Sequence, residues 1–280
     1  MILVTGATGV TGGEVARLLA AAGPVRVLVR DRARLTVTGP RVEVAEAAYA
    51  DRDGLLRALK GIRAAFLVTT DPGSPDDDRF MAAAVRAGVR HVVKLSSYAA
   101  GEEDADDLIT EWQRAAERTI RGSGVDWTFL RPRSFMSNTL AWAPSIRAEG
   151  VVRSLHAAAA NACVDPRDIA EVAVRALTTP GHAGRVYALT GPEALTAADQ
   201  TARLADVLGR PLAFEELTFA QAAAQWAARY PAPVVDALLR SARRQSLGHK
   251  ATVTRTVTDL TGRPPRSFRD WAASHRAAFL

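Results

Sequence analysis

The chain is poor in cysteine and in long apolar runs, and each shortage excludes a class of protein. Cys163 is the only cysteine, so no internal disulfide can form, which favours a reducing, cytoplasmic setting. No apolar stretch approaches the roughly 20 residues of a membrane span. The first residues lack the basic and apolar regions of a signal peptide. We therefore expect a protein with no membrane partner.

Lysine and metal-binding motifs are also scarce. Only three of the 36 basic residues are lysines, and the net charge is +6. The arginines are scattered, and the acidic runs 76–78 and 102–107 interrupt them. This pattern favours a solvated surface over a nucleic-acid partner. The five histidines form no H-E-x-x-H motif and no cysteine pair exists, so we expect no metal site.

Short apolar runs alternate with helical patterns over the first half of the chain, which predicts a parallel sheet built from βαβ units. Asp168 is expected to cap the last helix of this part. We expect strands at 2–5, 25–29, 42–45, 65–69, 92–95, 127–130 and 186–189, and helices at 14–20, 55–60, 79–88, 111–121 and 168–177.

From about residue 191 the pattern becomes mainly helical, at 196–208, 219–228 and 232–244, with an extended run at 212–217. The chain is therefore predicted to be an α/β protein. Its core is a doubly wound parallel (Rossmann) sheet, formed by residues 1–132 and 165–190. A smaller, mainly helical part covers the substrate, formed by the irregular segment 133–164 and by residues 191–280.

Three glycines follow the first strand at intervals of three residues: Gly6, Gly9 and Gly12. A turn from strand to helix leaves unpaired N–H groups that attract a phosphate. Gly6 permits the tight turn, Gly9 lets the backbone touch a pyrophosphate, and Gly12 lets the helix lie close to the sheet. Thr8 and Val10 complete the predicted dinucleotide loop; a plain glycine-rich turn is the alternative.

The end of the second strand distinguishes the two nicotinamide cofactors, because an arginine there accommodates a 2′-phosphate and an acid repels it. Arg30 occupies this position, about twenty residues past the turn. NADPH is therefore the predicted cofactor. Asp31 argues against this if it points inward, and a surface role is the alternative for Arg30.

Five segments together resemble the NmrA-like family, a branch of the extended and atypical short-chain dehydrogenase/reductases. They are VTGATGVTGG at 4–13, VKLSS at 93–97, WTFLRPRSFMSN at 127–138, LTGPEALT at 189–196 and LTGRPPRSF at 260–268. The resemblance implies a sheet of order 3-2-1-4-5-6-7 and bound NAD(P)(H). It also implies a C-terminal part that closes over the nicotinamide. Some members of the family are quinone or enone reductases, and others are redox sensors without turnover.

The superfamily's catalytic Tyr and Lys, four residues apart on one helix, have no counterpart here. Glu117 matches the Glu that often follows this Lys by four residues, so the two positions fall on Gln113 and Ile109. Neither side chain can donate the required proton. An enzyme with these residues must depend on positioning of the hydride donor, which suits quinones and activated enones.

Candidate site residues follow the ends of the later strands, where open α/β sheets bind ligands. Ser97, Phe135 and Asn138 are the catalytic candidates, although a turn, a core aromatic and a loop contact are their respective alternatives. Ser96, Thr69, Thr70 and Pro132 are expected beside the cofactor. Tyr98, Phe135, Trp142 and His156 are expected to contact the substrate, with structural roles as the alternative.

Two functions are consistent with these residues. The first is an NADPH-dependent oxidoreductase acting on a quinone-like or planar aromatic or enone substrate. A tailoring step of bacterial aromatic polyketide biosynthesis is one setting for it. The second is a non-catalytic NAD(P)(H)-sensing protein, suggested by Ile109 and Gln113. We expect a small-molecule aromatic or quinone partner, no nucleic acid, and a monomer or homodimer.

Overall fold

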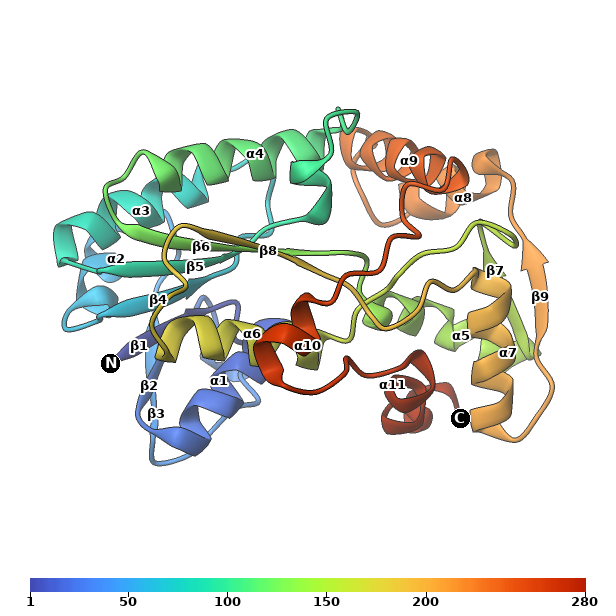
Figure 1. Cartoon of the computed structure of the whole chain (residues 1–280), viewed down its shortest axis with the longest axis horizontal. Helices are drawn as coiled ribbons and strands as arrows, with labels where there is room; N and C mark the ends of the chain where they lie inside the picture. The colour runs from blue at the N-terminus through green and yellow to red at the C-terminus, as the bar shows by residue number, and fades with distance from the viewer. The chain divides into compact units, whose positions relative to one another are not determined.

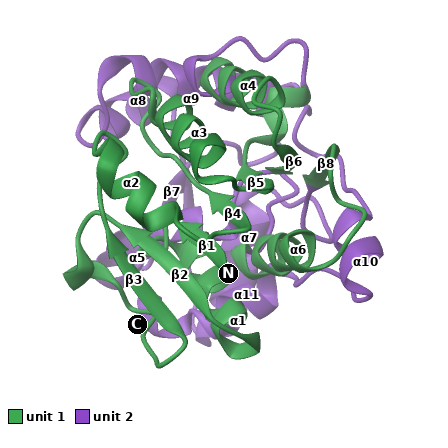
Figure 2. Cartoon of the chain, turned by 90° about the vertical axis from the view of Figure 1, so that its left-hand side faces the viewer, with its two compact units in different colours: residues 1–101, 111–132, 166–188 green, residues 102–110, 133–165, 189–280 purple.

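The computed structural model describes residues 1–280 (Figure 1). The chain divides into two compact units, drawn in different colours in Figure 2. Unit 1 comprises residues 1–101, 111–132 and 166–188, and unit 2 comprises residues 102–110, 133–165 and 189–280. None of the helices is both long enough and apolar enough to span a bilayer.

Unit 1 is built on a seven-stranded sheet with the order β3-β2-β1-β4-β5-β6-β8, and neighbouring strands from β3 to β6 are parallel. The order predicted from the resemblance is confirmed, because β8 is the seventh strand of this sheet along the chain. The strands are β1 (Ile2–Thr5), β2 (Val25–Val29), β3 (Val42–Glu46), β4 (Ala64–Leu67), β5 (His91–Leu95), β6 (Asp126–Pro132) and β8 (Arg185–Leu189).

Helices cover both faces of this sheet, as a doubly wound fold requires (Figure 1). α1 packs against α6 on one face, and α2 packs against α3 on the other. Two short 3-10 turns, η1 (Arg32–Arg34) and η2 (Tyr98–Gly101), follow β2 and β5. The helices are α1 (Val10–Ala22), α2 (Arg52–Leu59), α3 (Asp76–Ala87), α4 (Leu108–Arg121) and α6 (Pro166–Thr178).

The prediction that Asp168 caps α6 is wrong. The helix begins at Pro166, so Asp168 lies in its first turn, where it is fully buried. Proline favours the first helical position, because its fixed φ suits the helix and its missing N–H would have no partner there. α6 therefore begins two residues before the start of the predicted helix at 168–177.

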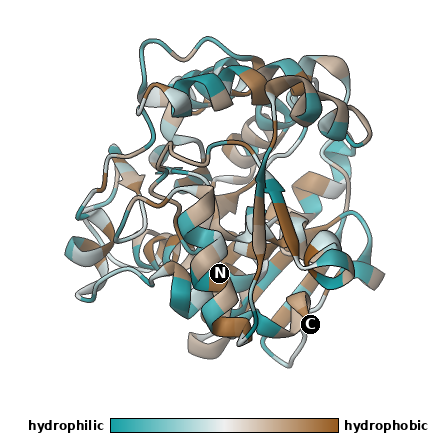
Figure 3. Ribbon diagram, turned by 90° about the vertical axis from the view of Figure 1, so that its right-hand side faces the viewer, coloured by the Kyte–Doolittle hydropathy of each residue, from teal (hydrophilic) through white to brown (hydrophobic).

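Unit 2 contains more regular structure than the sequence indicates. The segment expected to be irregular contains η3 (Met136–Trp142), α5 (Ala143–Glu149) and β7 (Val151–Ser154), and β7 pairs in parallel with β9 (Ala213–Glu216). The hydrophobic core of unit 2 includes Met136, Phe268 and Trp271. Figure 3 shows hydrophilic and hydrophobic residues interleaved along the helical ribbons. The remaining elements are α7 (Ala197–Leu208), α8 (Phe219–Ala227), α9 (Ala232–Ser246), α10 (Thr256–Thr261), α11 (Phe268–Ser274) and η4 (Arg276–Phe279).

Candidate active site

The glycine loop in unit 1 has the form that a dinucleotide site requires. Gly6 adopts φ +65°, and its carbonyl accepts a hydrogen bond from the Gly9 amide at 2.9 Å. A Cβ on Gly12 would lie 2.3 Å from the Gly6 carbonyl oxygen, so α1 sits directly against the end of β1. Of the three glycines, only Gly9 has free space above it, since a Cβ there would meet nothing closer than 3.4 Å.

The start of α1 is suited to an anion. Its first turn contains no acidic residue, and no side chain caps its amides. Thr8, Gly9 and Val10 are exposed, Val10 to 55%, although an apolar side chain gains nothing from contact with water. Unpaired amides at a helix N-terminus bind phosphate well. These residues therefore fit the pyrophosphate of a dinucleotide.

The charged residues after β2 would suit the binding of a 2′-phosphate. Arg30 is exposed, and Arg32 and Arg34 follow it in η1. The carboxylate of Asp31 is already hydrogen-bonded, because it caps η1 by accepting the Ala33 amide at 2.9 Å. Its cap role removes the main argument against Arg30 as the residue that selects the cofactor.

Several predicted cofactor residues use their side chains inside unit 1. The Thr69 hydroxyl accepts a hydrogen bond from Lys94 at 2.7 Å and contacts Asp77 at 2.9 Å. The Ser96 hydroxyl donates to Glu117 at 2.7 Å. Both side chains are buried, so their backbones remain the groups that can reach a cofactor. Thr70 is exposed and Pro132 is buried at the end of β6.

The helix that carries Ile109, Gln113 and Glu117 is α4, as predicted. Glu117 is 1% exposed and accepts two hydrogen bonds from Arg131, at 2.9 and 2.6 Å, in addition to that from Ser96. It is therefore an anchor between α4 and the sheet. Gln113 is buried, and its side-chain oxygen has no partner. Nothing on this face of α4 can act as a proton donor in place of the missing tyrosine.

Two further predicted residues belong to the end of β5. The Ser97 hydroxyl makes no hydrogen bond within the protein, so it is available to a ligand, and Tyr98 begins η2. Neither residue lines the cavity of unit 2.

Unit 2 contains a partly open cavity of about 640 Å³, within the usual range for small-molecule sites. Phe135, Asn138, Trp142 and His156, all predicted from the sequence, line it together. Apolar side chains from several elements form much of the wall: Leu155, Leu195, Leu217, Ala222, Trp226 and Leu238. The cavity therefore offers an apolar surface together with a limited set of polar groups.

His156 is the only residue other than glycine with a positive φ, at 71°. Its Nε2 atom is buried without a partner, whereas Nδ1 lies 3.4 Å from the Ser246 hydroxyl. Burial and the positive charge of Lys250 lower the pKa of His156 below its ordinary value, so the ring is neutral at pH 7. Strained backbone and an unused ring nitrogen in a cavity are both typical of a binding residue.

Several polar residues that line the cavity were not predicted from the sequence, among them Ser241, Gln245 and Lys250. Gln245 accepts a hydrogen bond from the Asn161 amide at 3.2 Å, and Asn161 also donates to the Ser134 hydroxyl at 2.9 Å. These three residues lie on α9 and just after it, 80 or more residues from Asn161 in the chain. The scarcity of lysine was the one signal that could have marked Lys250.

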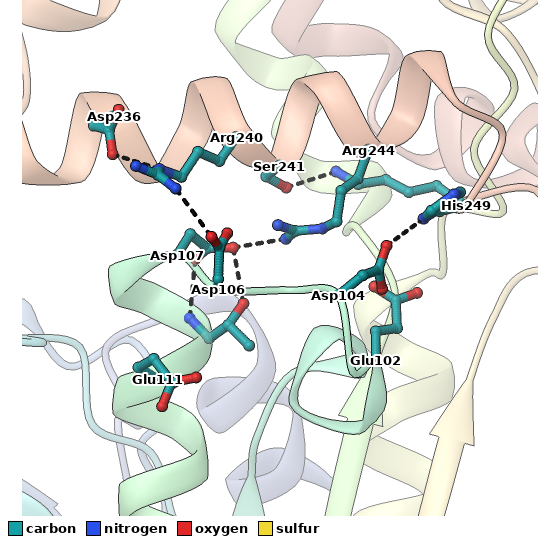
Figure 4. A network of polar contacts seen from close by, with 12 residues as sticks. Glu102, Asp104, Asp106, Asp107, Glu111, Asp236, Arg240, Ser241, Arg244 and His249 are labelled. Atoms are coloured by element: carbon teal, nitrogen blue, oxygen red, sulfur yellow. Dashed lines mark hydrogen bonds and ion pairs between the residues drawn. The ribbon is translucent and has the colours of Figure 1, made fainter.

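A charged network fixes α9 to the acidic segment 102–107 of the same unit (Figure 4). Arg244 donates to Asp107 at 2.6 Å, and both side chains are more than 90% buried. Burial raises the pKa of Asp107, but hydrogen bonds from Arg244 and Thr110 outweigh it and leave that pKa below its ordinary value. Arg240 and His249 bind Asp106 and Asp104 at 3.1 and 2.7 Å. The network thus holds the helix that carries Ser241 and Gln245.

Comparisons with known proteins agree with this arrangement. Residues 6–180 match the model of an NAD(P)H-binding family. The chain is 61% identical over 279 residues to a (4-alkanoyl-5-oxo-2,5-dihydrofuran-3-yl)methyl phosphate reductase of Streptomyces griseus, covering 100% of this chain and 99% of that protein. It is 37% identical to an NAD(P)H azoreductase of Xenophilus azovorans, covering 100% and 99%.

Solved structures give the same result. The Escherichia coli NADPH-dependent quinone oxidoreductase QOR2, in complex with NADPH, superposes with a TM-score of 0.85 at 27% identity, covering 99% of this chain and 100% of that one. These likenesses favour the enzyme over the cofactor-sensing alternative. The chain belongs to the NAD(P)H-binding family, as an oxidoreductase of the NmrA-like, atypical short-chain dehydrogenase/reductase type.

Proposed function

We propose that the protein uses NADPH to reduce a ring alkene conjugated to two carbonyls, in an acylated unsaturated lactone that carries a phosphomethyl group. The observation that supports this most strongly is the 61% identity, over 100% of the chain, to a reductase of such a compound. This substrate class is the enone part of the range that the sequence predicted. The quinone and aromatic substrates named alongside it are the runners-up, supported by the azoreductase and quinone oxidoreductase relatives.

The chemistry explains why no tyrosine is needed. In such a lactone, one alkene carbon bears both the ring carbonyl and the alkanoyl carbonyl. NADPH, when bound, supplies a hydride to the other alkene carbon. The negative charge then spreads over two carbonyl oxygens of the substrate, and a proton from solvent completes the reduction at the carbon between them. The lack of a catalytic Tyr and Lys at Ile109 and Gln113 therefore slows this reduction little. Reduction of an isolated ketone would require an acid.

The chain's own contribution is to bind and orient. The loop at Gly6, Gly9 and Gly12 would hold the pyrophosphate, and the free hydroxyl of Ser97 is available to the nicotinamide end of the cofactor. Phe135 and Trp142 present flat apolar surfaces in the cavity of unit 2, which suit a planar conjugated ring. Asn138 in the same cavity offers an amide that can hydrogen-bond a carbonyl.

Arg30 is predicted to select NADPH. Replacing Arg30 with alanine should raise the KM for NADPH about tenfold and leave the KM for NADH unchanged, because one charge-assisted hydrogen bond to the 2′-phosphate is lost. Steady-state kinetics with both cofactors measures this, and Arg41→Ala, at a distant exposed arginine, serves as the control. Equal losses with NADPH and NADH would contradict the assignment.

The function itself is tested by supplying the purified protein with NADPH and a synthetic 4-acyl furanone carrying the phosphomethyl group. We expect the absorbance of NADPH to fall in step with formation of the saturated lactone, identified by mass spectrometry. A simple ketone of similar size should not be reduced. Turnover of quinones alone, with none of the furanone, would instead support the quinone reductase.

A further inference from the structure

Lys250 is partly buried and has no acidic partner, unlike the three buried Lys and Arg residues of the protein. Lys94 pairs with Asp77 at 3.1 Å, Arg133 with Glu102 at 2.8 Å and Arg244 with Asp107 at 2.6 Å. The ammonium of Lys250 is partly buried in the wall of the unit 2 cavity, and its single bond is to the neutral hydroxyl of Ser241, at 2.8 Å. A charge withdrawn from water is normally paired, so Lys250 is suited to take an anion from outside the chain.

The residues around Lys250 add positive charge to this part of the cavity. Burial and, to a lesser extent, the positive charges of Arg244 and Arg133 together lower the pKa of Lys250 to about 8, against smaller opposing effects of Cys163 and Glu102. Each of these two arginines is paired with a carboxylate, whereas Lys250 is not. Such an arrangement is typical of a functional site, where stability is lower than it could be for the sake of binding.

Hydrogen-bond donors accompany the charge. Ser241 accepts from Lys250 and donates to no protein group, so its hydroxyl hydrogen is free. The Ser134 hydroxyl accepts a hydrogen bond from Asn161 and likewise donates to no protein group. Both serines line the cavity. The Lys250 carbonyl accepts the Ala162 amide at 2.9 Å, which fixes the lysine beside Asn161. An ammonium and hydroxyl groups are the donors that the oxygens of a phosphate monoester accept.

We propose that Lys250, with the hydroxyls of Ser241 and Ser134, holds the phosphate group of the substrate in the unit 2 cavity, an assignment that rests on the proposed function. The apolar wall at Leu155, Trp226 and Leu238 then receives the alkanoyl chain. A substrate with a charged head and an apolar tail thus finds both kinds of surface in one cavity.

The test compares the phosphorylated furanone with the alcohol obtained from it by phosphatase, in the intact protein and in Lys250→Met. We expect Lys250→Met to raise the KM for the phosphorylated substrate at least tenfold, with kcat and the kinetics of the alcohol within twofold of the original. Lys250→Arg should recover most of the affinity. Lys60→Met, the same change at an exposed lysine, should behave as the original protein.

The pH profile gives an independent measurement. Because the pKa of Lys250 is about 8 without ligand, its charge is lost above that pH. kcat/KM for the phosphorylated substrate should therefore fall as the pH rises through about 8, while that for the alcohol should not. Lys250→Met should remove the difference between the two profiles. Its melting temperature should be equal to or above that of the original protein, so that the loss is not one of folding.

Equal losses on the phosphorylated substrate and the alcohol would overturn the proposal, since Lys250 would then serve structure or the reaction itself. If the protein reduces neither compound, the proposed function fails, and calorimetry with inorganic phosphate decides about Lys250. Phosphate binding that Lys250→Met abolishes would support an anion site without the furanone. Absence of binding, or binding unaffected by the substitution, would overturn it.

Discussion

Alanine in place of Gly9 is expected to leave the protein folded and to weaken NADPH binding by about a hundredfold, through loss of the close approach between loop and pyrophosphate. A Cβ at this position meets only the Gly6 carbonyl oxygen, at 3.4 Å, which is an ordinary contact. Its φ of −98° suits any residue. The protein should therefore tolerate the methyl group. However, the methyl group would fill the space at the start of α1 that the pyrophosphate needs.

The matched control is Gly12→Ala. Its Cβ would lie 2.3 and 2.5 Å from the carbonyl oxygen and carbon of Gly6, backbone atoms that cannot move without displacing α1. We expect it to lose about 1–3 kcal/mol of stability as well as the cofactor. Titration with NADPH and thermal unfolding measure the two effects separately. A Gly9→Ala variant that binds NADPH as the original protein does would mean that the pyrophosphate lies elsewhere.

The parts of the fold predicted from sequence are those determined by local patterns. Wholly buried strands such as β1 and β4 appear as apolar runs, and the seven strands of the sheet were all located. β7 was missed because Val151–Ser154 is a short run containing an arginine. Its pairing with β9, about 60 residues away, stabilises it, and no window of sequence shows such a partner.

The site divides in the same way. The glycine loop is one continuous motif, so its residues could be named from their spacing. Side-chain partners could not be predicted, because Ser96 and Thr69 direct their hydroxyls to Glu117, Lys94 and Asp77, residues 8 to 25 positions away. Lys250 was missed for the same reason: its meaning depends on the absence of an acid around it in the folded protein.

The buried pair of Lys94 and Asp77 gives the second large effect. Asp77→Ala is expected to lower the free energy of unfolding by about 3–5 kcal/mol, because it leaves the Lys94 ammonium buried without its counter-charge. The Lys94 side chain is 0% exposed, Asp77 is 4% exposed, and Nζ and Oδ1 are 3.1 Å apart. The Thr69 hydroxyl at 2.7 Å and the Trp112 ring at 5.5 Å cannot replace a carboxylate. Urea unfolding at pH 7 measures the loss.

The pH dependence identifies the cause of that loss. Burial already lowers the pKa of Lys94 below its ordinary value, and removal of Asp77 takes away the stronger of the two charges that raise it, leaving only the smaller effect of Glu117. The unfolded chain then binds a proton that the folded protein does not, so the stability of Asp77→Ala should rise with pH up to the ordinary lysine range. The double variant Lys94→Met/Asp77→Leu removes both charges and should recover most of the stability at pH 7. A single-variant loss below about 1 kcal/mol, the size of an exposed pair, would show that water reaches this pair in solution.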